Sequence, residues 1–290
     1  MEAFDYLAPR SLSEALGALG NGKRSLMLAG GTDVIVQLRE NRRHCDQLID
    51  LKHIPELMSY RFAGDGSLEI GAAVPLAELY EDTQVQNKVP ALVDCATIIG
   101  GIAIQSRASL GGNLCNASPA ADSSPALMAL GARLVIASNG GNREVAVEEF
   151  FSGPGQNTLQ PGELLLTVKI PAPAANSGAF YHRFIPRNEM DIAVASSGVS
   201  ITLDGSGNIS AARVALGAVA ATPLMVPAAA TVLIGKPAGA EAFAEAGEAA
   251  GAAASPIDDM RGGVAQRRHL SKILTVRALE GALQRIPGSR

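Results

Sequence analysis

Two glycine-containing segments limit what this chain can fold into more than any other feature of its sequence. One is AGGTD at residues 29–33, which follows a short apolar run, and the other is ASLGGNLCNASPAADSSPAL at 108–127. Because glycine lacks a Cβ, Gly111 and Gly112 can adopt positive φ and let backbone amides approach a ligand. Two such loops, about eighty residues apart, could face each other and hold a pyrophosphate. Taken alone, AGGTD is equally typical of a tight turn after a strand.

The side chains of the second segment favour a phosphate ester bound by neutral groups. Ser109, Asn113, Asn116 and Ser118 supply hydroxyl and amide donors beside the glycines. The sequence contains neither G-x-G-x-x-G nor G-x-x-x-x-G-K-[ST], so the Rossmann and P-loop signatures are absent.

Hydrophobic periodicity divides the first 175 residues into two α/β units. Residues 1–55 predict a small unit, with a helix capped by Ser11, a strand at 26–28, a helix from Val34 and a strand at 48–51. Residues 56–175 predict the second unit. Its expected elements are a strand at 68–72, a helix whose first position is Pro75, a helix from Ser124 to Leu130, and strands at 132–138, 144–147 and 164–170.

A second domain is expected over residues 179–286. PAPAANSG at 171–178 interrupts both ladders and helices, so it marks the boundary. DGSGN at 204–208 predicts an antiparallel hairpin, and helices are expected at 238–254 and 267–283. The apolar stripe of the last helix is more typical of a core than of a partner surface. The predicted fold class is therefore α+β, with a two-part N-terminal α/β domain followed by antiparallel sheet and helices.

Composition excludes several classes of protein. A net charge of −4 without a long basic run argues against nucleic acid as a partner. No apolar run approaches the roughly 20 residues of a membrane span, and the start of the chain does not resemble a signal peptide, so we expect a cytoplasmic protein.

Cysteines and histidines do not predict a metal site. Cys45, Cys95 and Cys115 are far apart, and the four histidines have no ligand spacing, so we expect this chain to bind no metal. Cys115 lies in the second glycine segment and could react with a flavin, but a packing thiol is the preferred interpretation.

Motifs along nearly the whole chain resemble one family. AGGTD, TIIGG at 97–101, ASLGGN and SPAADSSPAL are followed in order by EEFFSGPGQNTL, GELLLTVKIP, RFIPRNEMDIA and DDMRGGVAQRRHLSKILTVRALEGAL. This series is similar to the FAD-binding subunit of the xanthine dehydrogenase and carbon monoxide dehydrogenase family of molybdenum hydroxylases. The resemblance implies an FAD-binding domain of the PCMH type. Because the chain has no convincing attachment residue, we expect it to bind FAD non-covalently.

The resemblance also implies which residues contact FAD. In the first phosphate loop these are Met27, Leu28, Ala29, Gly30, Gly31, Thr32, Asp33, Val34 and Ile35, and in the second Ser109, Gly112, Asn113 and Asn116. Ile99 matches a position that packs on the flavin ring, and Leu165 matches another apolar neighbour. Both are also plausible core residues.

Two charged residues complete the implied site. Asp122 matches a carboxylate placed towards the adenosine half of FAD, with a helix cap as the alternative. Arg183 stands where several family members have a lysine near the flavin ring, and a cation there would favour the reduced flavin. A surface ion pair with Glu189 or Asp191 is the alternative for Arg183, and Arg187 is a weaker candidate for the same role.

The resemblance implies electron transfer, with no catalytic acid, base or nucleophile in this chain. A small partner subunit would carry two [2Fe–2S] clusters and a large one molybdopterin, assembled as a dimer of heterotrimers. FAD would pass electrons from the clusters to an external acceptor. A self-contained flavin oxidase and a scaffold without flavin are the alternatives, and the sequence does not identify the substrate of the complex.

Overall fold

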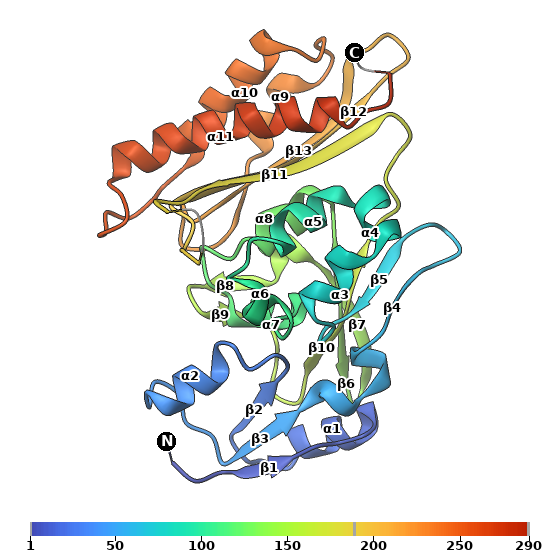
Figure 1. Ribbon diagram of the computed structural model, residues 1–290, viewed down its shortest axis with the longest axis vertical. Coiled ribbons are helices and arrows are strands. Elements are labelled where there is room, and N and C mark those ends of the chain that lie inside the picture. Colours follow the sequence, from blue (N-terminus) through green and yellow to red (C-terminus); the bar gives the residue numbers. More distant parts are fainter. Residues whose placement is uncertain (1, 188–189, 289–290) are drawn as a thin grey trace.

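The computed structural model describes residues 2–187 and 190–288 and shows two domains packed against each other (Figure 1). The N-terminal domain has two parts, which lie at the bottom and in the middle of the view. The C-terminal domain, with α9, α10 and α11, lies at the top. The predicted α+β class and the order of the two domains are confirmed.

The first part of the N-terminal domain is a three-stranded parallel sheet in the order β1-β3-β2. Its elements are β1 (Asp5–Leu7), α1 (Leu12–Leu19), β2 (Ser25–Leu28), α2 (Val34–Arg39) and β3 (Gln47–Asp50), followed by the 3-10 helices η1 (Leu51–His53) and η2 (Pro55–Leu57). Ser11 begins α1 as predicted, because its hydroxyl accepts from the amide of Glu14. Leu28 pairs with Asp50, so AGGTD leaves the sheet directly beside the end of β3.

The second part is a five-stranded antiparallel sheet in the order β4-β5-β10-β6-β7, accompanied by short helices. The strands are β4 (Tyr60–Phe62), β5 (Leu68–Gly71), β6 (Arg133–Ser138), β7 (Gly141–Ala146) and β10 (Leu164–Ile170). The helices are α3 (Leu76–Glu81), α4 (Thr83–Lys88), α5 (Pro90–Ala96), α6 (Ile102–Gln105), α7 (Leu110–Asn116), α8 (Ser123–Ala129) and η3 (Val147–Glu149). A small hairpin of β8 (Phe151–Gly153) and β9 (Gln156–Asn157) lies outside the main sheet. Pro75 is the residue before α3, one position earlier than predicted.

The segment 108–127 differs from its prediction, because most of it is helical. Gly111 and Gly112 lie within α7, and neither has a positive φ. Leu110 and Leu114 are fully buried on one face of that helix, since side chains four residues apart project in the same direction. Burial of these two leucines stabilises the short helix α7 in a stretch whose glycines suggested a loop.

The C-terminal domain is a four-stranded sheet in the order β11-β12-β13-β14, packed against three helices. The strands are β11 (Ser177–Phe184), β12 (Ala195–Leu203), β13 (Ile209–Gly217) and β14 (Leu224–Met225), and the helices are α9 (Pro227–Leu233), α10 (Ala240–Ala253) and α11 (Val264–Gln284). β12 and β13 form the predicted hairpin. Leu274, Ala278 and Leu279 of α11 are buried in the core of this domain, as the stripe predicted.

The C-terminal sheet is covered on both faces. α11 packs on β11 and β12 from one side, and α5 and α8 of the N-terminal domain pack on the other (Figure 1). At Gly198 in β12 a Cβ would lie 2.3 Å from the carbonyl oxygen of Pro125, so only glycine lets α8 approach the strand this closely. The two domains are therefore in direct backbone contact beside the segment that carries Asp122.

Candidate functional site

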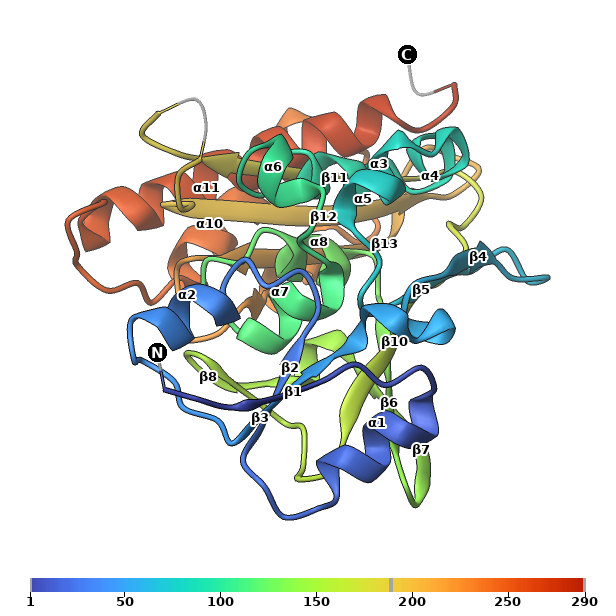
Figure 2. The ribbon, with the colours of Figure 1, turned by 60° about the horizontal axis from the view of Figure 1, so that its bottom comes forward.

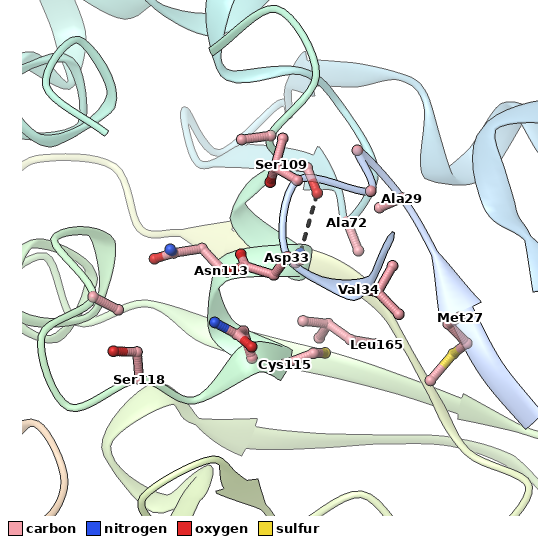
Figure 3. A pocket seen from close by; sticks show the side chains of 18 of the residues that line it. Met27, Ala29, Asp33, Val34, Ala72, Ser109, Asn113, Cys115, Ser118 and Leu165 are labelled. Carbon is pink, nitrogen blue, oxygen red and sulfur yellow. Dashed lines mark hydrogen bonds between the residues drawn. The ribbon is translucent and has the colours of Figure 1, made fainter. Parts of the chain in front are cut away.

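A cavity of about 790 Å³ lies where the two parts of the N-terminal domain meet the C-terminal domain (Figure 3). Its size falls within the range of about 300–1,000 Å³ found for small-molecule sites. The site residues expected from the sequence that line it are Met27, Ala29, Gly30, Gly31, Thr32, Asp33, Val34, Ile99, Ser109, Gly112, Asn113, Asn116, Asp122, Leu165 and Arg183. The fold thus gathers these residues from widely separated parts of the chain around one space.

Leu28 and Ile35 do not line the cavity. Leu28 is buried with Leu26 and Leu48 in the core of the first part, whereas its neighbour Met27 lines the cavity. Ile35 is 38 % exposed on α2. The structure therefore gives no cavity contact for these two members of the expected loop, and their part in FAD binding stays a prediction.

The first loop presents free backbone donors. Among the described residues, the amides of Gly30, Gly31, Thr32 and Asp33 donate to no protein acceptor. Gly31 has φ +79°, a left-handed conformation that glycine adopts without strain. Successive amides around such a turn form a concave anion site, which is the chemistry that a diphosphate requires.

The second segment faces the first loop across the cavity, as Figure 3 shows for Ser109 and Asn113 opposite Val34 and Ala29. The hydroxyl of Ser109 accepts from the amide of Gly112 at 3.1 Å, which caps α7. A Cβ on Gly112 would have Ala29 Cβ at 4.0 Å. The missing side chain of Gly112 therefore keeps open the space between the two segments.

Two contacts bring the segments together. A Cβ on Gly30 would lie 2.0 Å from the carbonyl oxygen of Arg107, so the two backbone segments can contact each other only because glycine has no side chain. The side-chain amide of Gln37 on α2 donates to the side-chain oxygen of Asn116 on α7 at 3.1 Å, and both views place these helices side by side (Figures 1 and 2). The glycines of the site are thus needed for close approach, with Gly31 also supplying a positive φ.

Asp122 and Arg183 form a buried ion pair across the domain boundary. Arg183 Nη1 donates to Asp122 Oδ2 at 2.7 Å, and the Tyr181 hydroxyl donates to Oδ1 at 2.6 Å. Burial raises the pKa of Asp122, and the charge of Arg183 and the two hydrogen bonds offset only part of that effect. Burial and the neighbouring Asp122 raise the pKa of Tyr181 well above its usual value, so this phenol remains a donor.

This pair corrects three expectations. Asp122 and Arg183 cannot serve opposite ends of one FAD, because their side chains are in contact. The side chain of Asp122 does not cap α8. Asp191 pairs with Arg187 and Arg261 rather than with Arg183, and Glu189 lies outside the described residues. Beyond Asp122, the guanidinium of Arg183 has no hydrogen-bond partner in the part of the chain that the structure describes, so its remaining N–H groups are available to the cavity.

The apolar wall of the cavity includes Ile99, Leu165 and Cys115. Leu165 is only 2 % exposed and belongs to the main core, so it serves both as core and as cavity wall. Burial raises the pKa of Cys115 to about 12, which keeps the sulfur in the unreactive thiol form. This supports packing over covalent attachment.

The wall also includes segments that the sequence did not suggest. Among them are residues 157 and 159–163 in and after β9, Gly100 with Ile104, and residues 190–192 between β11 and β12. Glu163 is held by a bidentate bond from Arg143, with both distances at 2.7 Å. The motifs TIIGG, EEFFSGPGQNTL and RFIPRNEMDIA contain or border these segments, but nothing in their spacing shows that they meet.

The described residues show neither a metal site nor a membrane span. Within residues 2–187 and 190–288, no three His, Cys, Asp or Glu side chains are grouped so that they could hold a metal ion. No helix in the same ranges has both the length and the apolar character of a membrane span.

Sequence families match nearly all of this fold. The FAD binding domain in molybdopterin dehydrogenase matches residues 2–173, and the CO dehydrogenase flavoprotein C-terminal domain matches residues 180–282. The xanthine dehydrogenase FAD-binding subunit of Escherichia coli O157:H7 is 34% identical over 76% of this chain and 75% of its own length. The carbon monoxide dehydrogenase medium chain of Hydrogenophaga pseudoflava is 31% identical over 97% of this chain and 98% of its own.

Solved structures agree with these matches. A chain of carbon monoxide dehydrogenase from Hydrogenophaga pseudoflava superposes with a TM-score of 0.93 at 31% identity, covering 98% of this chain and 99% of that one. A chain of quinoline 2-oxidoreductase from Pseudomonas putida 86 gives 0.91 at 30% identity, with 98% of each chain covered. With two glycine segments facing each other around a cavity of the right size, and with both domain families in order, this chain belongs to the FAD-binding subunits of the molybdenum hydroxylase family of dehydrogenases.

Proposed function

We propose that this chain binds one FAD non-covalently in the cavity and passes electrons from iron–sulfur clusters on a partner subunit to an external acceptor. The observation that carries the proposal is the row of unpartnered amides at 30–33 facing Ser109 and Gly112, in a chain similar over almost its full length to dehydrogenase medium chains. FAD supplies the ability to accept electrons singly and release them in pairs.

The residues of this chain would bind and tune that cofactor. The first loop would hold the diphosphate through the amides of residues 30–33, with Ser109 and Asn113 on the opposite wall. Arg183 and Asp122 would lie together at the flavin end, where their charges influence the reduction potential. We keep Ile99 and Leu165 as apolar neighbours of the ring.

The cavity wall favours electron transfer over a self-contained oxidase. Within the described residues, its lining contains no histidine and no tyrosine, the groups that most readily exchange protons with a bound substrate. Of the four carboxyl groups in that lining, those of Asp122, Glu163 and Asp191 are paired with arginine, and that of Asp33 has no ion pair within the described residues. Substrate oxidation would therefore take place on a partner subunit.

We propose that this chain works together with partner subunits, because the names of its relatives describe single subunits of enzymes. Medium chains of carbon monoxide dehydrogenase and FAD subunits of nicotinate dehydrogenase are parts of larger enzymes. For this chain we infer an iron–sulfur subunit and a molybdopterin subunit, assembled as a dimer of heterotrimers.

Two measurements test the proposal. The purified chain should bind one equivalent of FAD, and acid should release it as free FAD. Coexpression with candidate iron–sulfur and molybdopterin subunits should give a complex that contains iron and molybdenum and reduces the flavin when substrate is added. Flavin that stays attached to the denatured polypeptide, a preference for FMN, or full substrate turnover by the isolated chain would each contradict it.

A further inference from the structure

Lys52 contacts the first glycine loop from the side away from the cavity. Its ammonium group donates to the carbonyl oxygen of Ala29 at 3.1 Å and to Asp50 Oδ1 at 2.6 Å. Ala29 lines the cavity, whereas Lys52 does not. The ammonium group of Lys52 therefore binds the backbone of the loop from outside the cavity.

This contact fixes the orientation of one peptide plane. No peptide bond in the described chain is cis, and in a planar trans peptide the carbonyl and the following N–H point in opposite directions. Because Lys52 holds the carbonyl of Ala29 away from the cavity, the N–H of Gly30 is turned towards the cavity. That N–H is one of the amides without a protein acceptor.

Arg107 makes a weaker contact of the same kind one residue later. Its Nε donates to the carbonyl oxygen of Gly30 at 3.4 Å, from an exposed side chain outside the cavity. The N–H of Gly31 belongs to that peptide and is directed away from Arg107. Two successive carbonyls of the loop are thus bound by cationic side chains that do not line the cavity.

The loop needs such restraint because it contains two adjacent glycines. Glycine crosses easily between backbone conformations, so the Ala29–Gly30 peptide could rotate and place a carbonyl oxygen where the amide should be. A carbonyl dipole facing a diphosphate would repel it.

Asp50 keeps Lys52 in place. Its side chain is 5 % exposed, and its other oxygen accepts from the Tyr6 hydroxyl at 2.5 Å. Burial opposes ionisation of Asp50, but hydrogen bonds from Lys52 and Tyr6 outweigh it and lower the pKa of this carboxyl. The carboxylate therefore stays charged near neutral pH and holds the ammonium group beside the loop.

We infer that Lys52 is a positioning residue for the diphosphate site. It fixes the orientation of the Ala29–Gly30 peptide with the N–H of Gly30 towards the ligand, and Arg107 has the same effect on the next peptide. The inference rests on the proposed binding of FAD. It concerns the orientation of backbone donors, and Lys52 itself does not touch the ligand.

The test compares Lys52→Met, Lys52→Arg and Tyr6→Phe in the isolated chain. Lys52→Met removes the bond to Ala29, and Lys52→Arg keeps a donor. Tyr6→Phe is the matched control, because it weakens the same Asp50 cluster without reaching the loop. Dissociation constants are measured by fluorescence for FAD and for riboflavin, which has no phosphate.

We expect Lys52→Met to bind FAD roughly tenfold more weakly, the value of about one hydrogen bond to a charged group. Its riboflavin affinity should be unchanged, Lys52→Arg should recover most of the FAD affinity, and Tyr6→Phe should match the wild type. Equal FAD affinity for Lys52→Met and wild type would overturn the inference while leaving the proposed function intact. An equal loss for riboflavin or for Tyr6→Phe would assign Lys52 a structural role, and a wild-type chain that binds no FAD would overturn both proposals.

If Lys52→Met does not fold, Arg107→Met supplies the second variant, because its side chain is exposed and carries no ion pair in the described structure. Its FAD affinity should fall by a smaller factor, about two- to fivefold for a weak neutral-acceptor bond, again without change for riboflavin. A wild-type FAD affinity in Arg107→Met would then contradict the inference that these cations orient the loop peptides.

Discussion

Arg183 donates to Asp122 across the domain boundary at 2.7 Å, and the two side chains are only 7 % and 9 % exposed. The pair joins β11 of the C-terminal domain to the residue just before α8 of the N-terminal domain, in the wall of the proposed FAD site. Its charges nearly cancel, so the cavity does not experience an isolated cation. Removing either partner should therefore change the local potential, with opposite signs.

The first prediction concerns the reduction potential of bound flavin. Arg183→Met removes the cation beside Asp122 and should lower the potential, because positive charge near the flavin favours its electron-rich reduced form. Asp122→Asn leaves the guanidinium and should raise it. Shifts on the order of 30 mV correspond to about 1.4 kcal/mol for a two-electron couple. Redox titration of the two variants measures these shifts. Shifts of the same sign, or no shift with full FAD occupancy, would show that the pair does not lie near the flavin ring.

The second prediction concerns stability. Asp122→Asn should destabilise the protein by about 3 kcal/mol, because a buried guanidinium is left without its counter-charge. The double variant with Arg183→Met should lose less than the sum of the two single variants, with a coupling of about 1–3 kcal/mol. Urea unfolding of the FAD-free proteins measures both values. Lys236→Met is the control, since its ion pair with Glu245 is exposed and should be nearly neutral.

The third prediction separates cofactor binding from folding at adjacent glycines. Gly112→Val should fold, because φ at Gly112 is not positive and the nearest atom to its Cβ would be the Ser109 hydroxyl at 3.2 Å. It should bind FAD more than tenfold weaker, since the side chain fills the gap towards Ala29. Calorimetric titration with FAD measures the loss.

Two neighbouring variants serve as controls for that experiment. Gly111→Ala should lose stability, because its Cβ would lie 2.4 Å from the carbonyl oxygen of Ala72. Gly17→Ala in α1 has nothing within 4 Å and should change neither property. Wild-type FAD affinity in Gly112→Val would show that the diphosphate binds elsewhere.

The fourth prediction concerns pH. Burial, with a contribution from Arg277, lowers the pKa of His182 in β11 below the ordinary 6.5. Below pH 6.5 the unfolded chain takes up a proton that the folded chain resists, so this residue makes stability fall as the pH drops through that window. His182→Gln should show a smaller loss of urea midpoint between pH 7.5 and pH 5.5 than wild type. An equal loss in both proteins would assign the dependence to other groups.

Local patterns in the sequence were sufficient for much of the fold. Ser11 begins α1 because a hydroxyl before an apolar helical stripe caps the first turn, and the turn at 204–208 joins two long strands because its residues cannot continue either. The two glycine segments could be recognised for the same reason, since unusual backbone requirements restrict residue type. The family resemblance, rather than composition, then identified FAD as the ligand, and the domain families agree.

What only the tertiary structure decided was the partner of each group. Gly111 and Gly112 suggested a loop, but burial of Leu110 and Leu114 made the segment helical, because core contacts outweigh a local preference for turns. Packing of elements distant in the chain formed the ion pair of Asp122 with Arg183 and the hydrogen bond from Lys52 to the carbonyl of Ala29. The sequence thus determined which residues could form a phosphate site. Because pairing across 61 and 23 positions leaves no periodic signal in the sequence, the fold alone determined how they are charged, oriented and held.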